Sequence, residues 1–93
     1  MAWYDVLDKM FAELADTLDF EYGKVGLHKG TYVFKKDNEI YGFVVFLNRN
    51  GNFVITMSQK GKHLEIGKYT KEELNTKAKK EILVKLAEKI TKH

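Results

Sequence analysis

The 93-residue chain contains no cysteine and no proline. Without cysteine it can form neither a disulfide nor a cysteine-based zinc site, and small secreted domains usually depend on disulfides, so we expect a cytoplasmic protein. Without proline, sharp changes in chain direction have to be made by Gly, Asn or Asp. No run of about 18 apolar residues occurs, and the first residues lack the basic and apolar segments of a signal peptide, so we expect no membrane association.

Arginine is also scarce, since Arg49 is the single arginine beside fifteen lysines. Arginine is the usual side chain for bidentate recognition of phosphate and guanine, so its scarcity disfavours sequence-specific binding of nucleic acid. The net charge of +3 is the balance of −5 over residues 1–22 and +8 over residues 23–93. A basic body attracts nucleic acid or an acidic protein, although a lysine-rich surface is also the ordinary coat of a soluble domain.

The residues that are present have the composition of a globular protein, with 44% hydrophobic and 31% charged residues. The length fits one small domain, so we expect residues 1–93 to fold around a single core. Apolar residues recur every three or four positions over residues 2–18, which predicts an amphipathic helix. A second helix is predicted over residues 71–91, because Thr70 and Glu73 form a capping-box pattern before a similar apolar stripe.

Four short apolar runs lie between the predicted helices, and turn residues separate them. The runs are residues 31–36, 40–47, 53–59 and 62–68, and the turns are Asp37-Asn38, Asn50-Gly51 and Lys60-Gly61. The predicted fold class is therefore α+β, in the order α-β-β-β-β-α, with a four-stranded antiparallel meander and two amphipathic helices on one face or on both. Residues 19–30 are interpreted as an ordered loop or as a short irregular strand.

Turn length decides which side chains share a face of this meander. If Asn50-Gly51 and Lys60-Gly61 are both two-residue turns, six apolar side chains align on one face. They form two rows, the first of Phe46, Ile55 and Ile66 and the second of Val44, Met57 and Leu64. The turn residues and this alignment are independent observations, so their agreement favours the meander.

The Asp37-Asn38 turn decides the place of four aromatic residues. A two-residue turn puts Phe34 opposite Tyr41 and Tyr32 opposite Phe43, on the second face of the sheet. A three-residue loop instead sends Tyr32 and Phe34 to the first face. The sequence leaves both registers open.

The aromatic cluster is the candidate binding site. On an open face, its four rings would stack nucleobases or contact a protein. Beneath a helix, the same rings would form core. The candidate binding residues are the four aromatics and three nearby lysines: Tyr32, Phe34, Tyr41, Phe43, Lys35, Lys60 and Lys62.

Residues suited to catalysis or metal binding are few. His28, His63 and His93 are the only histidines, and without cysteine they complete no zinc motif. Ser58, the single serine, faces His63 across the predicted hairpin but does not lie in a Gly-x-Ser-x-Gly motif. We therefore expect no catalytic residue, no metal and no cofactor.

These patterns favour a chain that acts by presenting a surface. We expect a non-enzymatic protein-interaction module, such as a small accessory or inhibitory protein with a protein partner. The alternative is binding of RNA or single-stranded DNA through the aromatic face and its flanking lysines. A third hypothesis is homodimerisation through the same face.

Overall fold

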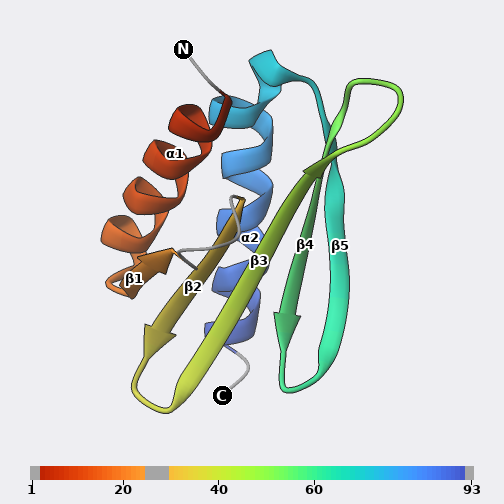
Figure 1. Cartoon of the computed structure of the whole chain (residues 1–93). Coiled ribbons are helices and arrows are strands. Elements are labelled where there is room, and N and C mark those ends of the chain that lie inside the picture. Colours follow the sequence, from red (N-terminus) through yellow and green to blue (C-terminus); the bar gives the residue numbers. More distant parts are fainter. Residues whose placement is uncertain (1–2, 25–29, 92–93) are drawn as a thin grey trace.

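The computed structural model describes residues 3–24 and 30–91, and it has the predicted α+β architecture (Figure 1). Helix α1 (Trp3–Leu18) precedes a five-stranded antiparallel sheet, and a second helical segment follows it. The strands are β1 (Glu21–Lys24), β2 (Thr31–Lys36), β3 (Glu39–Leu47), β4 (Phe53–Gln59) and β5 (Lys62–Tyr69). The second segment has a 3-10 turn η1 (Lys71–Glu73), a π-helical turn η2 (Leu74–Ala78) and helix α2 (Lys79–Thr91).

The predicted count of four strands is wrong by one, because β1 forms an additional edge strand. Glu21–Lys24 pairs with β2, with Tyr22 opposite Phe34 and Gly23 opposite Val33. The strand has four residues with a glycine inside it, so its sequence signal is weak. Of the two interpretations of residues 19–30, the strand holds for residues 21–24, while His28 lies outside the described residues.

The β2–β3 hairpin decides between the two registers left open at Asp37-Asn38, because it has the two-residue turn. Lys36 pairs with Glu39, Phe34 with Tyr41 and Tyr32 with Phe43. Asp37 adopts a φ of 55°, in the left-handed region that tight hairpin turns require of a central residue. All four aromatic side chains therefore share one face of the sheet.

The β3–β4 hairpin contradicts the predicted two-residue turn at Asn50-Gly51. Leu47 pairs with Phe53, and the Asn48 N–H donates to the Asn52 carbonyl over 2.9 Å, so three residues form the loop. Gly51 has a φ of 80°, which fits a three-residue hairpin loop that ends in a left-handed residue.

Because the loop has one residue more than predicted, the β4 side chains point to the opposite faces from those that the two-residue turn required. Ile55 lies opposite Val45 and Met57 opposite Phe43, so the predicted pairing of Phe46 with Ile55 and of Val44 with Met57 is wrong. The six apolar residues of the two predicted rows do not lie on one face.

The β4–β5 hairpin confirms the two-residue turn at Lys60-Gly61, with Ser58 opposite His63 and Met57 opposite Leu64. The register then shifts, because Thr56 pairs with Glu65 whereas Ile55 pairs with Gly67. Ile66 is the extra residue of this β-bulge. The predicted pairing of Ile55 with Ile66 is therefore wrong.

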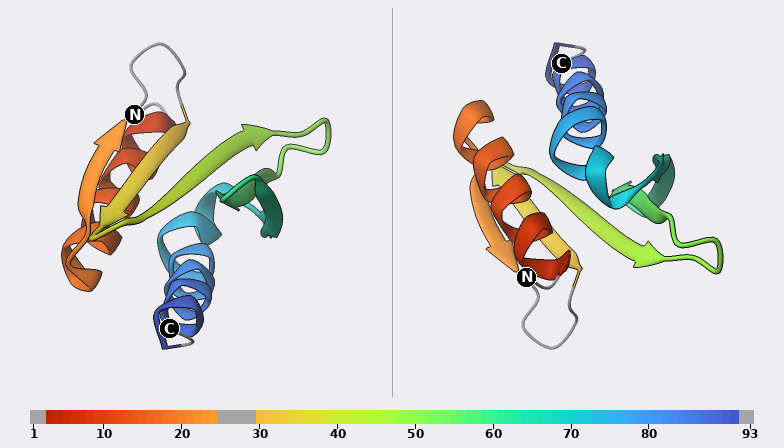
Figure 2. Two further views of the ribbon diagram at one scale, coloured as in Figure 1. Left: turned by 90° about the horizontal axis from the view of Figure 1, so that it is seen from below. Right: turned by 90° about the horizontal axis from the view of Figure 1, so that it is seen from above.

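Both helices pack on the face that carries the aromatic residues. Phe11 of α1 stacks on Tyr32 with ring centroids 4.3 Å apart, and it approaches Phe43 at 5.2 Å. The second helical segment buries Leu74, Ala78, Ile82 and Leu86 in the same core. Figure 2 shows α2 on the inner side of the curled sheet. Of the two predicted arrangements, the structure has both helices on one face.

The second helical segment begins at the predicted capping box. The backbone N–H of Thr70 donates to the Glu73 carboxylate over 2.9 Å, and this hydrogen bond lowers the pKa of Glu73. The buried residues Leu74 and Ala78 lie in the π-helical turn, which joins the capped end to the regular helix α2.

Candidate interaction surface

The four aromatic residues of the predicted site are core residues. Tyr32, Phe34, Tyr41 and Phe43 are each 0–1% exposed beneath the two helices. They therefore offer no exposed platform for a nucleobase or a protein, and the core interpretation of this cluster is the correct one. Rings in mutual contact add about 0.5–1.5 kcal/mol per pair beyond the area they bury, so the cluster stabilises the fold.

The three lysines of the predicted site are exposed and lie in different places. Lys35 is on β2, on the face away from the helices, where it pairs with Ile40 of β3. Lys60 and Lys62 lie at the β4–β5 turn, and the Lys60 Nζ is 3.9 Å from the Glu39 Oε1. The lysines and the aromatic residues therefore do not form one site.

A different group of residues is exposed on the face of the sheet that the helices leave uncovered. We call this side the open face. Its centre is β3, where Ile40, Val44 and Phe46 are 55%, 44% and 51% exposed. These residues alternate with Tyr41, Phe43 and Val45, which point into the core. Strand β3 is thus apolar on both faces although only one face is covered.

The strands beside β3 border this apolar centre. Val44 lies between Thr31 of β2 and Thr56 of β4, and Phe46 lies beside Val54. Val54 is only 3% exposed although it is on the open face. The large exposed apolar side chains of the open face are therefore those of β3, and exposed apolar patches of sufficient size usually mark interaction sites.

Charged residues of both signs lie on the strands toward the two sides of the open face. Glu21 of β1 pairs with Lys35 of β2 at one side, and Glu65 and Lys68 lie on β5 at the other. All four are exposed, and their formal charges cancel. An apolar centre with a polar rim is the usual anatomy of a protein–protein interface.

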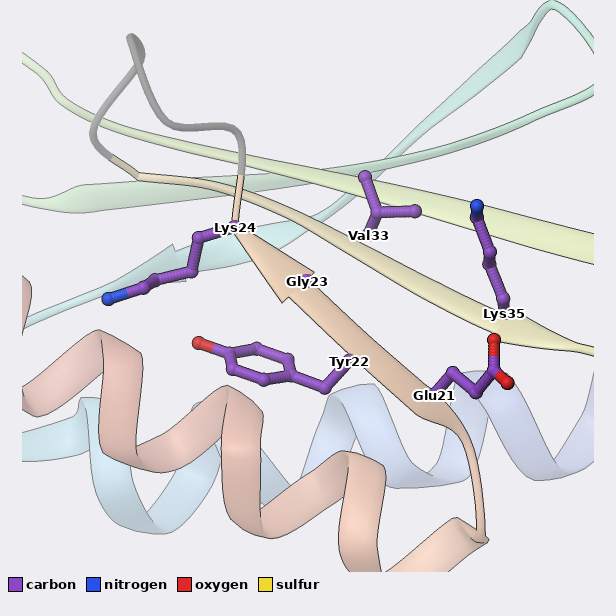
Figure 3. Close-up of a pocket in the computed structure, with 6 residues that line it drawn as sticks. All are labelled: Glu21, Tyr22, Gly23, Lys24, Val33 and Lys35. Atoms are coloured by element: carbon purple, nitrogen blue, oxygen red, sulfur yellow. The ribbon is translucent and has the colours of Figure 1, made fainter.

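A shallow hollow of about 290 Å³ lies at the β1 side of this face (Figure 3). Gly23 lacks a side chain there, and a Cβ at that position would meet no atom within 4 Å. Figure 3 shows Val33 and Lys35 pointing away from the helices, whereas Tyr22 points toward α1. The hollow therefore extends the open face to its edge and leaves room for a projecting side chain.

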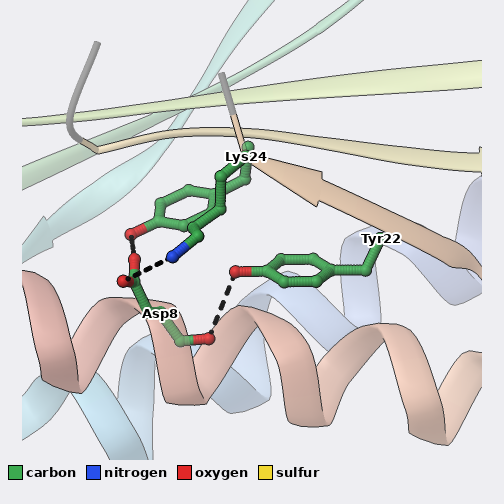
Figure 4. Close-up of polar contacts among 4 residues, drawn as sticks. Asp8, Tyr22 and Lys24 are labelled. Carbon is green, nitrogen blue, oxygen red and sulfur yellow. Dashed lines mark hydrogen bonds and ion pairs between the residues drawn. The ribbon is translucent and has the colours of Figure 1, made fainter. Parts of the chain in front are cut away.

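On the helix side, Asp8 of α1 holds the first two strands in place (Figure 4). The Tyr32 hydroxyl donates to Asp8 Oδ1 over 2.5 Å, and the Lys24 Nζ lies 3.3 Å from Asp8 Oδ2. The Tyr22 hydroxyl donates to the Asp8 backbone carbonyl over 3.4 Å. Burial and the neighbouring Asp8 carboxylate raise the pKa of Tyr32. The carboxylate is engaged by structural partners, so the network anchors β1 and β2.

A second hollow, of about 410 Å³, lies at the β4–β5 turn and is lined by Lys60, Lys62 and Lys89 over Met57 and Leu64.

Over residues 3–24 and 30–91, no three His, Asp or Glu side chains converge to hold a metal ion. His63 is exposed opposite Ser58, whereas His28 and His93 lie outside the described residues. No helix in these ranges is long and apolar enough to span a bilayer.

Comparison of the chain with protein-family models, curated proteins and solved structures gave no match. The site therefore has to be argued from its own geometry.

The sequence analysis missed Ile40, and it placed Val44 and Phe46 on the wrong side of the sheet relative to Ile55. The sequence did contain a signal for exposed apolar residues on this strand. Residues 40–46 have apolar side chains at both odd and even positions, and in a sheet that is covered on one face, one of these two sets has to be exposed.

Proposed function

We propose that this protein is a non-enzymatic protein-interaction module whose binding surface is the open face of the sheet. The observation that carries the proposal is the exposure of Ile40, Val44 and Phe46 on the middle strand of that face. Exposed apolar area of this kind favours association, because each square ångström removed from water contributes about 25 cal/mol. The cytoplasmic location and the absence of catalytic and cofactor chemistry stay predictions.

The rim of the open face supports a protein partner over a nucleic acid. A strand of RNA or DNA is bound through a groove with an excess of positive charge and through exposed aromatic rings. On the open face Lys35 and Lys68 are matched by Glu21 and Glu65, and Phe46 is the one exposed ring among the described residues there. The aromatic residues that suggested nucleobase stacking are buried.

A photo-crosslinking amino acid tests the proposal in the cells that make the protein. We place it at Val44, in the centre of the open face, and in a control at Val84 of α2, which is similarly exposed at 48%. The expected result is a discrete crosslinked protein band from position 44 and none, or a different one, from position 84. Identical patterns at both positions, or no product at position 44, would contradict the proposal.

A further inference from the structure

We propose that the hollow between the β4–β5 turn and α2 binds an amphipathic anion, a molecule that carries a carboxylate or phosphate group on an aliphatic chain. The site is separate from the open face, because it lies on the helix side of the sheet. It brings Lys60 and Lys62, two lysines of the predicted site, together with Lys89. Its volume of about 410 Å³ lies within the range of about 300–1,000 Å³ that small-molecule sites occupy.

The floor of the hollow is a part of β5 that α2 leaves uncovered. Leu64 pairs with Met57, which is buried in the core, so Leu64 is on the helix side of its strand. Leu64 is nonetheless 43% exposed. Figure 1 shows the β4–β5 turn and the last turns of α2 at the same end of the molecule. The hollow therefore has an apolar floor, with Leu64 at its surface and Met57 beneath.

Three lysines from different elements surround this floor. Lys60 lies in the turn, Lys62 on β5 and Lys89 in the last turn of α2. Neither Lys62 nor Lys89 forms an ion pair with another of the described residues. Like charges that converge on one hollow repel one another, and an anion bound between them replaces this repulsion by attraction.

The negative charge near the lysines is smaller than their positive charge. The Glu39 Oε1 lies 3.9 Å from the Lys60 Nζ, and the Glu39 Oε2 accepts a hydrogen bond from the Gln59 Nε2 over 2.5 Å. Glu88 precedes Lys89 but does not line the hollow. The C-terminal end of α2 adds a partial negative charge, which Lys89 offsets. Three lysines against one nearby carboxylate leave the hollow positive.

The lysines and the apolar floor together select the class of ligand. A lysine ammonium group is a compact charge that binds a carboxylate or a phosphate without the planar geometry of arginine. An inorganic anion would leave Leu64 in water, and an uncharged chain would leave the lysines without a counter-charge. An anion with an aliphatic chain satisfies both, because its head lies among the lysines while its chain covers Leu64.

An amide NMR titration of the purified chain with octyl phosphate tests the proposal. We expect saturable shifts at residues 57–64 and at Lys89, with a dissociation constant of about 1 mM. Inorganic phosphate lacks the chain and octanol lacks the charge, so each should bind at least about tenfold more weakly. Added salt should also weaken the binding of octyl phosphate, because it screens the lysines.

Substitutions separate the two parts of the site. Lys62→Gln and Lys89→Gln should each weaken the binding of octyl phosphate by about three- to tenfold, because each removes one charge–charge contact. Lys35→Gln is the matched control, since it removes a lysine from the open face and should leave the affinity unchanged. Leu64→Thr should weaken the binding of octyl phosphate but not that of inorganic phosphate. Circular dichroism melting of each variant confirms that it is folded.

Vesicles distinguish a lipid headgroup from a free amphipathic anion as the source of this chemistry. Co-sedimentation with vesicles of equimolar phosphatidylcholine and phosphatidic acid, reduced by Lys62→Gln, would assign the site to a lipid headgroup. Binding of octyl phosphate without co-sedimentation would assign it to a free anion.

Three results would overturn the proposal. They are the lack of saturable shifts at the hollow, equal affinity for octanol and octyl phosphate, and equal affinity of the Lys62→Gln, Lys89→Gln and Lys35→Gln variants. None of these results affects the proposed function, because photo-crosslinking at Val44 tests the opposite face of the sheet.

Discussion

The phenol of Tyr32 donates a 2.5 Å hydrogen bond to the carboxylate of Asp8, which ties the second strand of the sheet to the first helix. Tyr32 is fully buried, so its hydroxyl has no water to replace this acceptor. The same carboxylate lies 3.3 Å from the Lys24 Nζ on β1. One acidic residue on α1 therefore holds the part of the sheet that forms the β1 side of the open face.

Replacing Asp8 should destabilise the protein because it leaves a buried phenol without an acceptor. We expect Asp8→Ala to lower the free energy of unfolding by about 1–3 kcal/mol, measured by urea denaturation. Asp8→Asn should cost less, since its amide oxygen can still accept the hydrogen bond. The double variant with Tyr32→Phe should be less unstable than the sum of the two single changes. Strict additivity would show that the two groups do not interact.

Stability should fall at alkaline pH because two of the buried tyrosines have strongly raised pKa values. Burial and the nearby carboxylates raise the pKa of Tyr32, beside Asp8, and of Tyr69, whose hydroxyl donates to Glu81. A raised pKa in the folded state means that the unfolded chain loses its proton first, near pH 10. The stabilisation is therefore complete below about pH 10, and it is lost by about 1.4 kcal/mol per pH unit for each tyrosine above that value.

Urea denaturation at pH 9, 10 and 11 measures this loss. Tyr32→Phe is the control, because it removes one of the two tyrosines and should make the decline less steep. Absorbance at 295 nm should show that at least two tyrosines ionise only when the protein unfolds, since burial also raises the pKa of Tyr22 and Tyr41. A free energy of unfolding that stays constant from pH 9 to pH 11 would contradict the burial of Tyr32 and Tyr69.

Two glycines inside strands should respond differently to the same substitution. A Cβ at Gly67 would lie 2.5 Å from the Tyr69 hydroxyl oxygen and 2.8 Å from Tyr69 Cζ, whereas a Cβ at Gly23 would meet nothing within 4 Å. Gly67→Ala should therefore displace the Tyr69 ring, weaken its hydrogen bond to Glu81 and cost about 1–3 kcal/mol. Gly23→Ala should be neutral or stabilise by about 0.4–1 kcal/mol, because it reduces the freedom of the unfolded chain.

Thermal melting of the two alanine variants checks this pair. Near-ultraviolet circular dichroism adds a direct signal, because Gly67→Ala should change the environment of Tyr69 and Gly23→Ala should not. Equal losses of stability at the two positions would mean that the close approach of Gly67 to Tyr69 has no energetic consequence.

Local signals predicted the helices, four of the strands and the two-residue Lys60-Gly61 turn, because each depends on residues close together in the chain. The capping box of Thr70 and Glu73 is one example, and the Lys60-Gly61 turn is another. Which β4 side chains point toward the helices depended instead on the length of the β3–β4 loop, and Asn48 determines that length. Its side-chain Oδ1 accepts the N–H groups of Asn50 and Asn52 and stabilises a loop longer than Asn-Gly alone indicates.

The candidate surface was not predicted because it follows from that register and from the placement of both helices on one side. Tyr32 and Phe43 formed an aromatic cluster as one predicted register required, yet the sequence did not say which face the helices cover. Helix placement depends on packing between segments far apart in the chain, such as Phe11 against Tyr32. A local pattern carries little information about such contacts.

The assignment of faces on β3 gives the most direct prediction, because Val44 and Val45 are neighbours in sequence and differ in burial. Val45 is 4% exposed in the core, whereas Val44 is 44% exposed on the open face. Valine and threonine have nearly the same shape, so a Val→Thr change mainly adds a hydroxyl. Val45→Thr should lower the free energy of unfolding by about 1–3 kcal/mol, the cost of burying that hydroxyl. Val44→Thr should change it by less than about 0.5 kcal/mol, as exposed substitutions usually do. Urea denaturation of dilute protein measures both changes in the monomer. A larger loss for Val44→Thr than for Val45→Thr would show that the two faces are exchanged, and it would remove the open face on which the proposed function depends.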